Sequence, residues 1–225
     1  MDQASPPTPP KIFPEALRES LRRAKVIAMV VIDDPDTAVP LARCLLENGI
    51  RAIELTLRTE AAFESLRRIR TECPELSAGL GTLLHPDQVG PAVEAGAAFA
   101  VAPGLNPRVV RAAAEAGLPF APGIVSPTDI EAAVELGCRQ LKFFPAEPSG
   151  GIPYLKSMHA PYAHLGLEYI PLGGLTADNY TDYLAVDCIP AVGGSWIAPR
   201  DRIREQDWDS IAANARQAIE HLPKT

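Results

Sequence analysis

The chain has 225 residues, 47% of them hydrophobic, so it can bury a full core as one domain. Its formal net charge of -7 gives no electrostatic reason to expect nucleic acid or an anionic membrane as a partner. No apolar run reaches the ~18 residues that a membrane span needs, so a soluble, enzyme-like domain is the favoured interpretation.

The N-terminus is rich in proline, with five among the first 14 residues. We expect residues 1–11 to form a flexible arm and residues 12–225 to form a single domain. The first residues lack the apolar stretch of a signal peptide. The chain has four cysteines without CxxC spacing, a pattern typical of the reducing cytoplasm rather than of a disulfide framework: Cys44, Cys73, Cys138 and Cys188.

Short apolar runs alternate with amphipathic stretches along the chain. We predict strands near residues 26–32, 52–56, 77–81, 98–102, 119–122, 139–144, 169–172 and 189–192. We predict helices near residues 36–48, 60–71, 87–95, 107–116, 127–136, 177–184 and 207–220, the last capped by Asp207 or Asp209. This alternation predicts an α/β fold, a (β/α)8 TIM barrel with an N-terminal extension and helix. An open doubly wound sheet is less favoured, because no GxGxxG follows the first strand.

Four segments share the pattern Glu-x-Gly followed by a short apolar run. The glycine fits the end of a helix, where a positive φ is needed, and the run fits a buried parallel strand. The segments are ENGIRAIEL (47–55), EAGAAFAVA (94–102), EAGLPFAPG (115–123) and ELGCRQLKF (135–143).

The repeat also sets a register between strands. Seven residues after each leading glutamate stand Glu54, Val101, Pro122 and Lys142, so Glu54 and Lys142 occupy equivalent places on the second and sixth strands. Alternate strands of a barrel contribute inward side chains to the same layer. We therefore expect this carboxylate and this amine to face each other across the C-terminal mouth.

Lys142 lies in an apolar run, between Leu141 and Phe143, near the end of a predicted strand. Such a lysine is partly removed from water, and its nucleophilic amine can form a Schiff base with a substrate carbonyl. The alternative is a lysine whose stem packs on apolar surface while its amine reaches water. The register match with Glu54 favours the catalytic interpretation.

Glu54 stands between two apolar residues of a short strand, which is costly unless the acid is paired or functional. It is a candidate general acid/base, and the alternative is a structural ion pair with Arg58 or Lys142. Arg58 follows a few residues later, where its planar guanidinium could grip a carboxylate through two hydrogen bonds. Its alternative is a solvated arginine at a helix start.

The loops after other predicted strands carry further candidates. Thr82 and Pro103 lie at two such loops, although each is also an ordinary turn residue. Two Gly-Gly turns, in PLGGLT (171–176) and AVGGSW (191–196), follow the last two strands, where barrels commonly bind phosphate through backbone N–H groups. Ser195 could add a hydroxyl donor, and the alternative is two tight turns. The histidines show no HxxxH or HExxH spacing, so no local metal motif is predicted.

Six motifs, in order and with matching spacing, resemble the 2-keto-3-deoxy-6-phosphogluconate (KDPG) aldolases and the related 2-keto-4-hydroxyglutarate (KHG) aldolases. They are ELTLRT (54–59), GLGT (79–82), APG (102–104), KFFPAE (142–147), PLGG (171–174) and GGSW (193–196). The likeness runs from about residue 20 to the C-terminus. It implies a class I, Schiff-base carbon–carbon lyase of the Entner–Doudoroff pathway, a cytoplasmic homotrimer of (β/α)8 barrels that needs no metal or other cofactor.

The resemblance also implies roles for individual residues in the cleavage of KDPG, a small phosphorylated keto acid, to pyruvate and glyceraldehyde 3-phosphate. The roles are Schiff-base lysine for Lys142, proton transfer for Glu54, carboxylate binding for Arg58 and Thr82, pocket walls for Pro103, Phe144 and Leu172, and phosphate binding for Gly173, Gly174 and Ser195.

Leu172 departs from the family, which usually has threonine at this place in PTGG. The threonine hydroxyl lies near the hydroxylated carbon of the substrate in the family, so leucine removes a polar contact and should change discrimination among hydroxylated substrates. Enzymes acting on the galactonate epimer, or on KHG, therefore remain alternatives. Outside this family, the alternatives are a phosphosugar-binding barrel without turnover and a phosphosugar isomerase that uses Glu54 as base.

Overall fold

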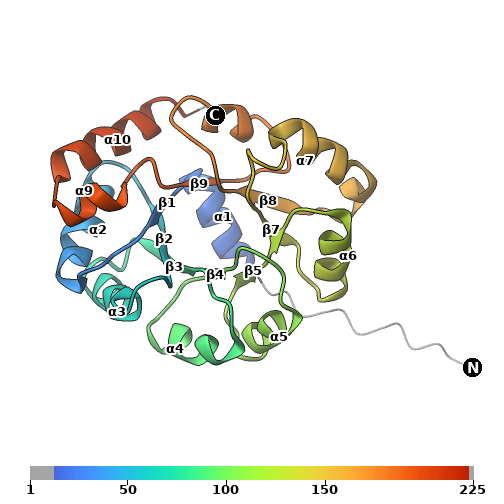
Figure 1. Ribbon diagram of the computed structural model, residues 1–225, viewed down its shortest axis with the longest axis horizontal. Coiled ribbons are helices and arrows are strands. Elements are labelled where there is room, and N and C mark those ends of the chain that lie inside the picture. Colours follow the sequence, from blue (N-terminus) through green and yellow to red (C-terminus); the bar gives the residue numbers. More distant parts are fainter. Residues whose placement is uncertain (1–12, 223–225) are drawn as a thin grey trace, which may run out of the picture.

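The computed structural model describes residues 13–222, and the predicted N-terminal arm, residues 1–11, lies outside the described residues. Short parallel strands occupy the centre of the molecule, helices surround them, and the first helix lies across the strands (Figure 1). Within residues 13–222 the strands are β1 (Val26–Val30), β2 (Ala52–Thr56), β3 (Ser77–Gly81), β4 (Ala100–Val101), β5 (Phe120–Ala121), β6 (Gly123–Ile124), β7 (Gln140–Phe143), β8 (Glu168–Pro171) and β9 (Val192–Gly194).

The helices follow the strands in alternation. They are α1 (Glu15–Ala24), α2 (Ala38–Glu47), α3 (Ala62–Glu72), α4 (Val89–Glu94), α5 (Pro107–Glu115), α6 (Pro127–Glu135), α7 (Gly151–His159), α8 (Tyr180–Leu184), α9 (Arg200–Arg204) and α10 (Trp208–Glu220), with short 3-10 helices η1 (Pro35–Thr37), η2 (Pro86–Gln88) and η3 (Ala160–Leu165). This order confirms the predicted α/β class.

The strands form a curled parallel sheet in two parts, with the orders β5-β4-β3-β2-β1-β9 and β6-β7-β8. The predicted strand at 119–122 is divided, because Pro122 separates β5 from β6 and cannot donate a backbone hydrogen bond. Its carbonyl still accepts a hydrogen bond of 2.8 Å from the Lys142 N–H, which links the two parts.

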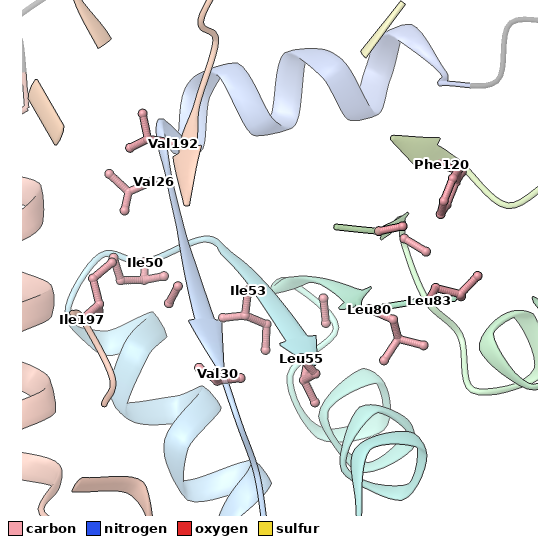
Figure 2. Close-up of a cluster of buried hydrophobic side chains, with 14 of the residues drawn as sticks. Val26, Val30, Ile50, Ile53, Leu55, Leu80, Leu83, Phe120, Val192 and Ile197 are labelled. Atoms are coloured by element: carbon pink, nitrogen blue, oxygen red, sulfur yellow. The ribbon is translucent and has the colours of Figure 1, made fainter. Parts of the chain in front are cut away.

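Side chains alternate along the strands between two apolar clusters. One set, including Val30, Ile53 and Leu55, packs outward against the surrounding helices, and Figure 2 shows part of it. The other set, including Ile27 and Ala52, points inward and packs with apolar residues at the N-terminal end of the described chain: Phe13, Leu17, Leu21 and Ala24. Helix α1 therefore covers the N-terminal end of the strands.

A polar cluster joins α1 to the strands. Glu168, whose side chain is only 10% exposed, accepts hydrogen bonds from Arg18, Arg22 and Gln140. Burial acts to raise the pKa of Glu168, but the hydrogen bonds from Arg18 and Gln140 and the two arginine charges outweigh it and lower the pKa. The carboxylate thus stays charged and anchors α1 at neutral pH.

Local sequence signals located several elements correctly. The four repeat glycines all have positive φ at helix ends, between 68° for Gly117 and 92° for Gly49, and Asp207 caps α10 by accepting from the Ser210 N–H at 3.1 Å. Helices α7 and α9 were not predicted. The sequence of α7 begins Gly-Ile-Pro, which reads as a turn, but Pro153 lies in the first helical turn, where no N–H is required.

No helix within residues 13–222 is long and apolar enough to span a membrane. In the same part of the chain the four cysteines are free. Burial raises the pKa of the Cys138 thiol to about 12, so this thiol stays protonated near neutral pH and packs as an apolar group.

Candidate active site

Lys142 and Glu54 meet at the C-terminal side of the strands. Lys142 Nζ donates a hydrogen bond of 2.9 Å to Glu54 Oε1, and their side chains are only 6% and 2% exposed. Lys142 is on β7 and Glu54 on β2, which lie in different parts of the sheet. The prediction from the repeat register, that the two groups face each other, is confirmed by this contact.

Neighbouring strands make room for the pair. Gly81, at the end of β3, has no side chain, and a Cβ built there would lie 1.9 Å from Glu54 Oε1. Glycine at this position therefore gives the carboxylate the space it occupies. Gly123 instead allows the backbone of Pro103 to approach closely, because a Cβ there would lie 2.2 Å from the Pro103 carbonyl group. Gly123 also stands opposite Lys142 in the β6–β7 register.

The pair lies in a cavity of about 300 Å³. The structure brings every predicted site residue to the wall of this cavity: Glu54, Arg58, Thr82, Pro103, Lys142, Phe144, Leu172, Gly173, Gly174 and Ser195. The residues come from strands and loops distributed around the sheet, as is usual for sites at the C-terminal ends of parallel strands.

Sequence reasoning missed two side chains beside Arg58. Thr56 lines the cavity, is buried, and accepts a hydrogen bond of 3.3 Å from Arg58 Nε, while Met29 Sδ lies 3.9 Å from a terminal guanidinium nitrogen. The alternation of side chains along a strand could have predicted both residues. Thr56 follows Glu54 by two residues on one strand, so both face inward, and Met29 stands opposite Glu54 in the β1–β2 register.

Two further residues of the cavity wall, Thr82 and Phe144, have unusual local geometry or contacts. Thr82 has a φ of 62°, an uncommon conformation for a β-branched residue and one that tends to occur at functional sites. The ring of Phe144 lies 5.3 Å from Lys142 Nζ, within the range of a cation–π contact. The amine is therefore held between an aromatic face and a carboxylate.

Of the two predicted Gly-Gly turns, Gly173-Gly174 forms a turn at one side of the cavity, whereas the prediction of a turn at Gly193-Gly194 is wrong, because both glycines belong to strand β9. Gly173 and Gly174 have φ of 93° and 86°, a conformation that strains other L-residues. Leu172 packs against strand β9, since a Cβ on Gly193 would lie 2.7 Å from the leucine side chain. Two adjacent peptide groups with positive φ can direct N–H groups to a common point and form an anion-binding concavity.

Within residues 13–222 no group of three or more His, Cys, Asp or Glu side chains is placed to hold a metal ion. The charged groups at the cavity are the amine of Lys142, the carboxylate of Glu54 and the guanidinium of Arg58. This set can capture a carbonyl, move a proton and bind an anion.

Comparisons with known proteins agree with this chemistry. A family model of aldolases, KDPG and KHG aldolase, matches residues 17–214. A 2-dehydro-3-deoxy-phosphogluconate aldolase of Dickeya dadantii is 38% identical over 209 residues, 93% of this chain and 97% of the relative. A KHG/KDPG aldolase of Escherichia coli is 38% identical over 200 residues, covering 89% and 93%. The crystal structure of KDPG aldolase from Legionella pneumophila, with pyruvate captured as a covalent carbinolamine, has a TM-score of 0.84 and 33% identity, covering 90% and 96%.

The fold and the buried amine–carboxylate pair define the class of protein, an α/β lyase that works through a Schiff base. The chain belongs to the KDPG and KHG aldolase family, because the family model spans most of it and relatives exceed 30% identity over nearly their whole length. Membership of this family favours an aldolase over the two alternatives outside it, the phosphosugar-binding barrel and the phosphosugar isomerase.

Proposed function

We propose that the protein is a class I aldolase that cleaves KDPG to pyruvate and glyceraldehyde 3-phosphate through a Schiff base on Lys142. The observation that carries this proposal is the 2.9 Å contact between Lys142 Nζ and Glu54 Oε1, both nearly buried in the wall of one cavity. The amine can attack a ketone, and the neighbouring carboxylate can accept the proton that the amine loses.

The reaction proceeds in four steps. The amine of Lys142 adds to the C2 ketone, and loss of water gives a protonated imine. Glu54, directly or through a water molecule, takes the proton of the C4 hydroxyl, the C3–C4 bond breaks, and its electron pair moves into the imine to give an enamine and the aldehyde. Glu54 returns a proton to C3, and water hydrolyses the resulting imine to pyruvate and the free lysine.

Arg58 and Thr82 bind the carboxylate of the keto acid. Arg58 carries the charge, and the contacts with Thr56 and Met29 fix the plane of its guanidinium. Pro103 and Phe144 form walls that keep the carbonyl carbon near Lys142. Anchoring the substrate in this way turns binding energy into orientation of the reacting carbon.

Gly173, Gly174 and Ser195 bind the phosphate of the substrate. Both glycines line the cavity with positive φ, and Ser195 lies on its rim as an exposed hydroxyl. Phosphate binding far from the reacting bond supplies energy that positions C2 and C4. A keto acid that lacks phosphate should therefore react more slowly.

Leu172 favours a second candidate substrate. It is buried, lines the cavity and packs on Gly193, so it offers no hydroxyl to the substrate. The galactonate epimer, and KHG, differ from KDPG around the hydroxylated carbon or beyond it, and an apolar wall discriminates weakly among them. Comparing kcat/KM for the two epimers assigns the preference.

The proposal extends to assembly, fold and location. We place the enzyme in the Entner–Doudoroff pathway of the cytoplasm as a homotrimer, with residues 12–225 as one aldolase domain. We propose that the sheet closes as a (β/α)8 barrel. Two hydrogen bonds support closure: one from the Lys142 N–H to Pro122, and one of 2.8 Å from the Tyr169 N–H to the Cys188 carbonyl, between β8 and the segment before β9.

The experiment that tests the assignment is reductive trapping. The protein is incubated with pyruvate and borohydride, digested and analysed by mass spectrometry. We expect one reduced pyruvyl group on Lys142, because the imine forms there and hydride addition makes it permanent. Lys156, on the surface helix α7, serves as the matched control, since Lys156→Ala should leave both trapping and cleavage unchanged.

An unmodified Lys142, or a Lys142→Ala variant that still releases pyruvate, would contradict the assignment. Binding of phosphosugars without pyruvate release would support the binding barrel instead. Interconversion of phosphosugars without a reducible adduct would support the isomerase.

A further inference from the structure

Glu147 closes the KFFPAE motif but is not part of the cavity wall, so the proposed mechanism leaves it without a role. It lies in the loop after β7, five residues beyond Lys142. Two backbone hydrogen bonds join this loop to the turn after β8: Ala146 N–H donates to the Leu172 carbonyl at 2.8 Å, and Glu147 N–H donates to the Gly173 carbonyl at 3.0 Å. They continue the pairing of β7 with β8 beyond both strands.

The stem of Glu147 also packs against the turn. A Cβ on Gly174 would lie 2.6 Å from Glu147 Cβ and 3.1 Å from its Cγ. The space beside Gly174 is therefore filled by the side chain of Glu147. The loop carrying Glu147 thus contacts both glycines of the turn, one through its backbone and the other through its side chain.

The carboxylate of Glu147 is held in turn by a tyrosine. The Tyr183 hydroxyl donates a hydrogen bond to Glu147 Oε1, and Tyr183 lies on α8, the helix that follows the glycine turn. Tyr183 is 1% exposed, whereas Glu147 is exposed. Burial raises the pKa of Tyr183, and the hydrogen bond to Glu147 raises it further, so the hydroxyl remains a donor.

We propose that Glu147 and Tyr183 are positioning residues for the phosphate-binding turn, which they hold between the loop after β7 and helix α8. The inference rests on the proposed function, because it assumes that Gly173 and Gly174 bind the substrate phosphate. Two adjacent glycines are intrinsically mobile, since they lack the side chains that restrict φ and ψ. N–H groups on a mobile turn would have to be ordered by each substrate molecule, at a cost in affinity.

The contacts also join the two ends of the substrate site. Lys142 and Glu147 belong to one short segment, so the strand that supplies the Schiff-base amine also restrains the turn that binds phosphate. The distance between the attacked ketone and the phosphate is fixed in the substrate. A matching fixed distance in the protein lets phosphate binding place C2 against Lys142.

The test compares two reactions in the intact protein. Cleavage of the phosphorylated substrate uses the whole site, whereas exchange of pyruvate methyl protons with D2O uses only Lys142, Glu54 and the carboxylate-binding residues. We expect Tyr183→Phe, which lacks the hydroxyl, to raise KM for the phosphorylated substrate about five- to tenfold. Proton exchange on pyruvate should stay within about twofold of the wild type, because no contact to pyruvate is lost.

Glu147 provides an independent variant, because it is exposed and its truncation leaves the core intact. Glu147→Ala should raise KM for the phosphorylated substrate as Tyr183→Phe does. Glu147→Gln keeps an acceptor oxygen, so its KM should stay near the wild-type value. Tyr162→Phe is the matched control. Its hydroxyl donates to Glu131 at 2.9 Å on the outer surface, so it removes the same kind of hydrogen bond away from the site.

The outcomes separate the two proposals. Cleavage and proton exchange that fall in parallel, or an unchanged KM in both Tyr183→Phe and Glu147→Ala, would overturn the positioning role while the wild-type enzyme still releases pyruvate. A wild-type protein that neither cleaves the substrate nor exchanges pyruvate protons would overturn the proposed function, and the positioning role with it.

Discussion

Gly81 is a position where one methyl group should impair catalysis while leaving the fold in place. Its Cβ would lie 1.9 Å from Glu54 Oε1, 2.7 Å from Cδ and 2.8 Å from Cγ. Ordinary contact begins at 3.4 Å, so the carboxylate must retreat by about 1.5 Å in a Gly81→Ala variant. The present 2.9 Å hydrogen bond to Lys142 would then break.

The size of the effect follows from this displacement. A misplacement of about 1 Å in a catalytic group can cost about 100-fold in rate, so we expect kcat to fall by at least about 100-fold. Overpacking should cost about 1–3 kcal/mol of folding stability, which leaves the protein folded at room temperature. Steady-state cleavage and thermal unfolding of the same preparation measure both quantities.

Gly90 provides the matched control. It lies in α4, and a Cβ there would meet no atom within 4 Å, so Gly90→Ala should keep full activity. Alanine in a helix also stabilises by about 0.5–1 kcal/mol relative to glycine. A folded Gly81→Ala variant with wild-type kcat would refute the reasoning, because it would show that Glu54 need not hold its observed place beside Lys142.

Two further predictions concern residues that support the site and the fold. Thr56→Val keeps the shape of the side chain but removes the acceptor for Arg58 Nε, so KM for pyruvate in the synthetic direction should rise about fivefold with little change in kcat; an unchanged KM would show that Arg58 orients itself. Glu168→Gln should lower the free energy of unfolding at pH 7 by about 2 kcal/mol, measured in urea, because Arg18 and Arg22 lose their charged acceptor. The pKa of Glu168 is lowered from its usual value of 4.5, so its contribution is present above that pH and disappears as pH falls through the lowered pKa. The difference between wild type and Glu168→Gln should therefore shrink below pH 4.5, and a constant difference would contradict the ionic role of Glu168.

The sequence was sufficient for the Lys142–Glu54 pair because both signals are local and periodic. A repeated helix end fixes where each strand starts, and alternation along the strand fixes which side chains face inward. The same rule applied to Thr56 would have found it, two residues beyond Glu54 on the same face. Its omission was a failure to apply the alternation rule, since the sequence contained the signal.

Other features could not be obtained this way, because they depend on contacts between distant segments. Tyr183 and Glu147 are separated by 36 positions, and neither belongs to the repeat. The hydrogen bond from the Lys142 N–H to the Pro122 carbonyl, which links the two parts of the sheet, also joins distant segments. No helix was predicted at α7, because its Gly-Ile-Pro start has low helix propensity, which tertiary context can override.

The interior of the sheet is layered, and the layering separates the two titratable clusters. Along β8 and the residue that follows it, the inward side chains run from Glu168 through Ile170 to Leu172, so an apolar layer stands between the cluster that holds α1 and the catalytic cavity. Helix α1 covers the cluster around Glu168, whereas the Lys142–Glu54 pair lies in the cavity that receives substrate. Charge interactions fall with distance, and within residues 13–222 no hydrogen bond joins the two clusters. Stability at low pH and catalysis should therefore respond to different residues. A Glu168 variant that unfolds more easily yet cleaves substrate at the wild-type rate is the result that this layering requires.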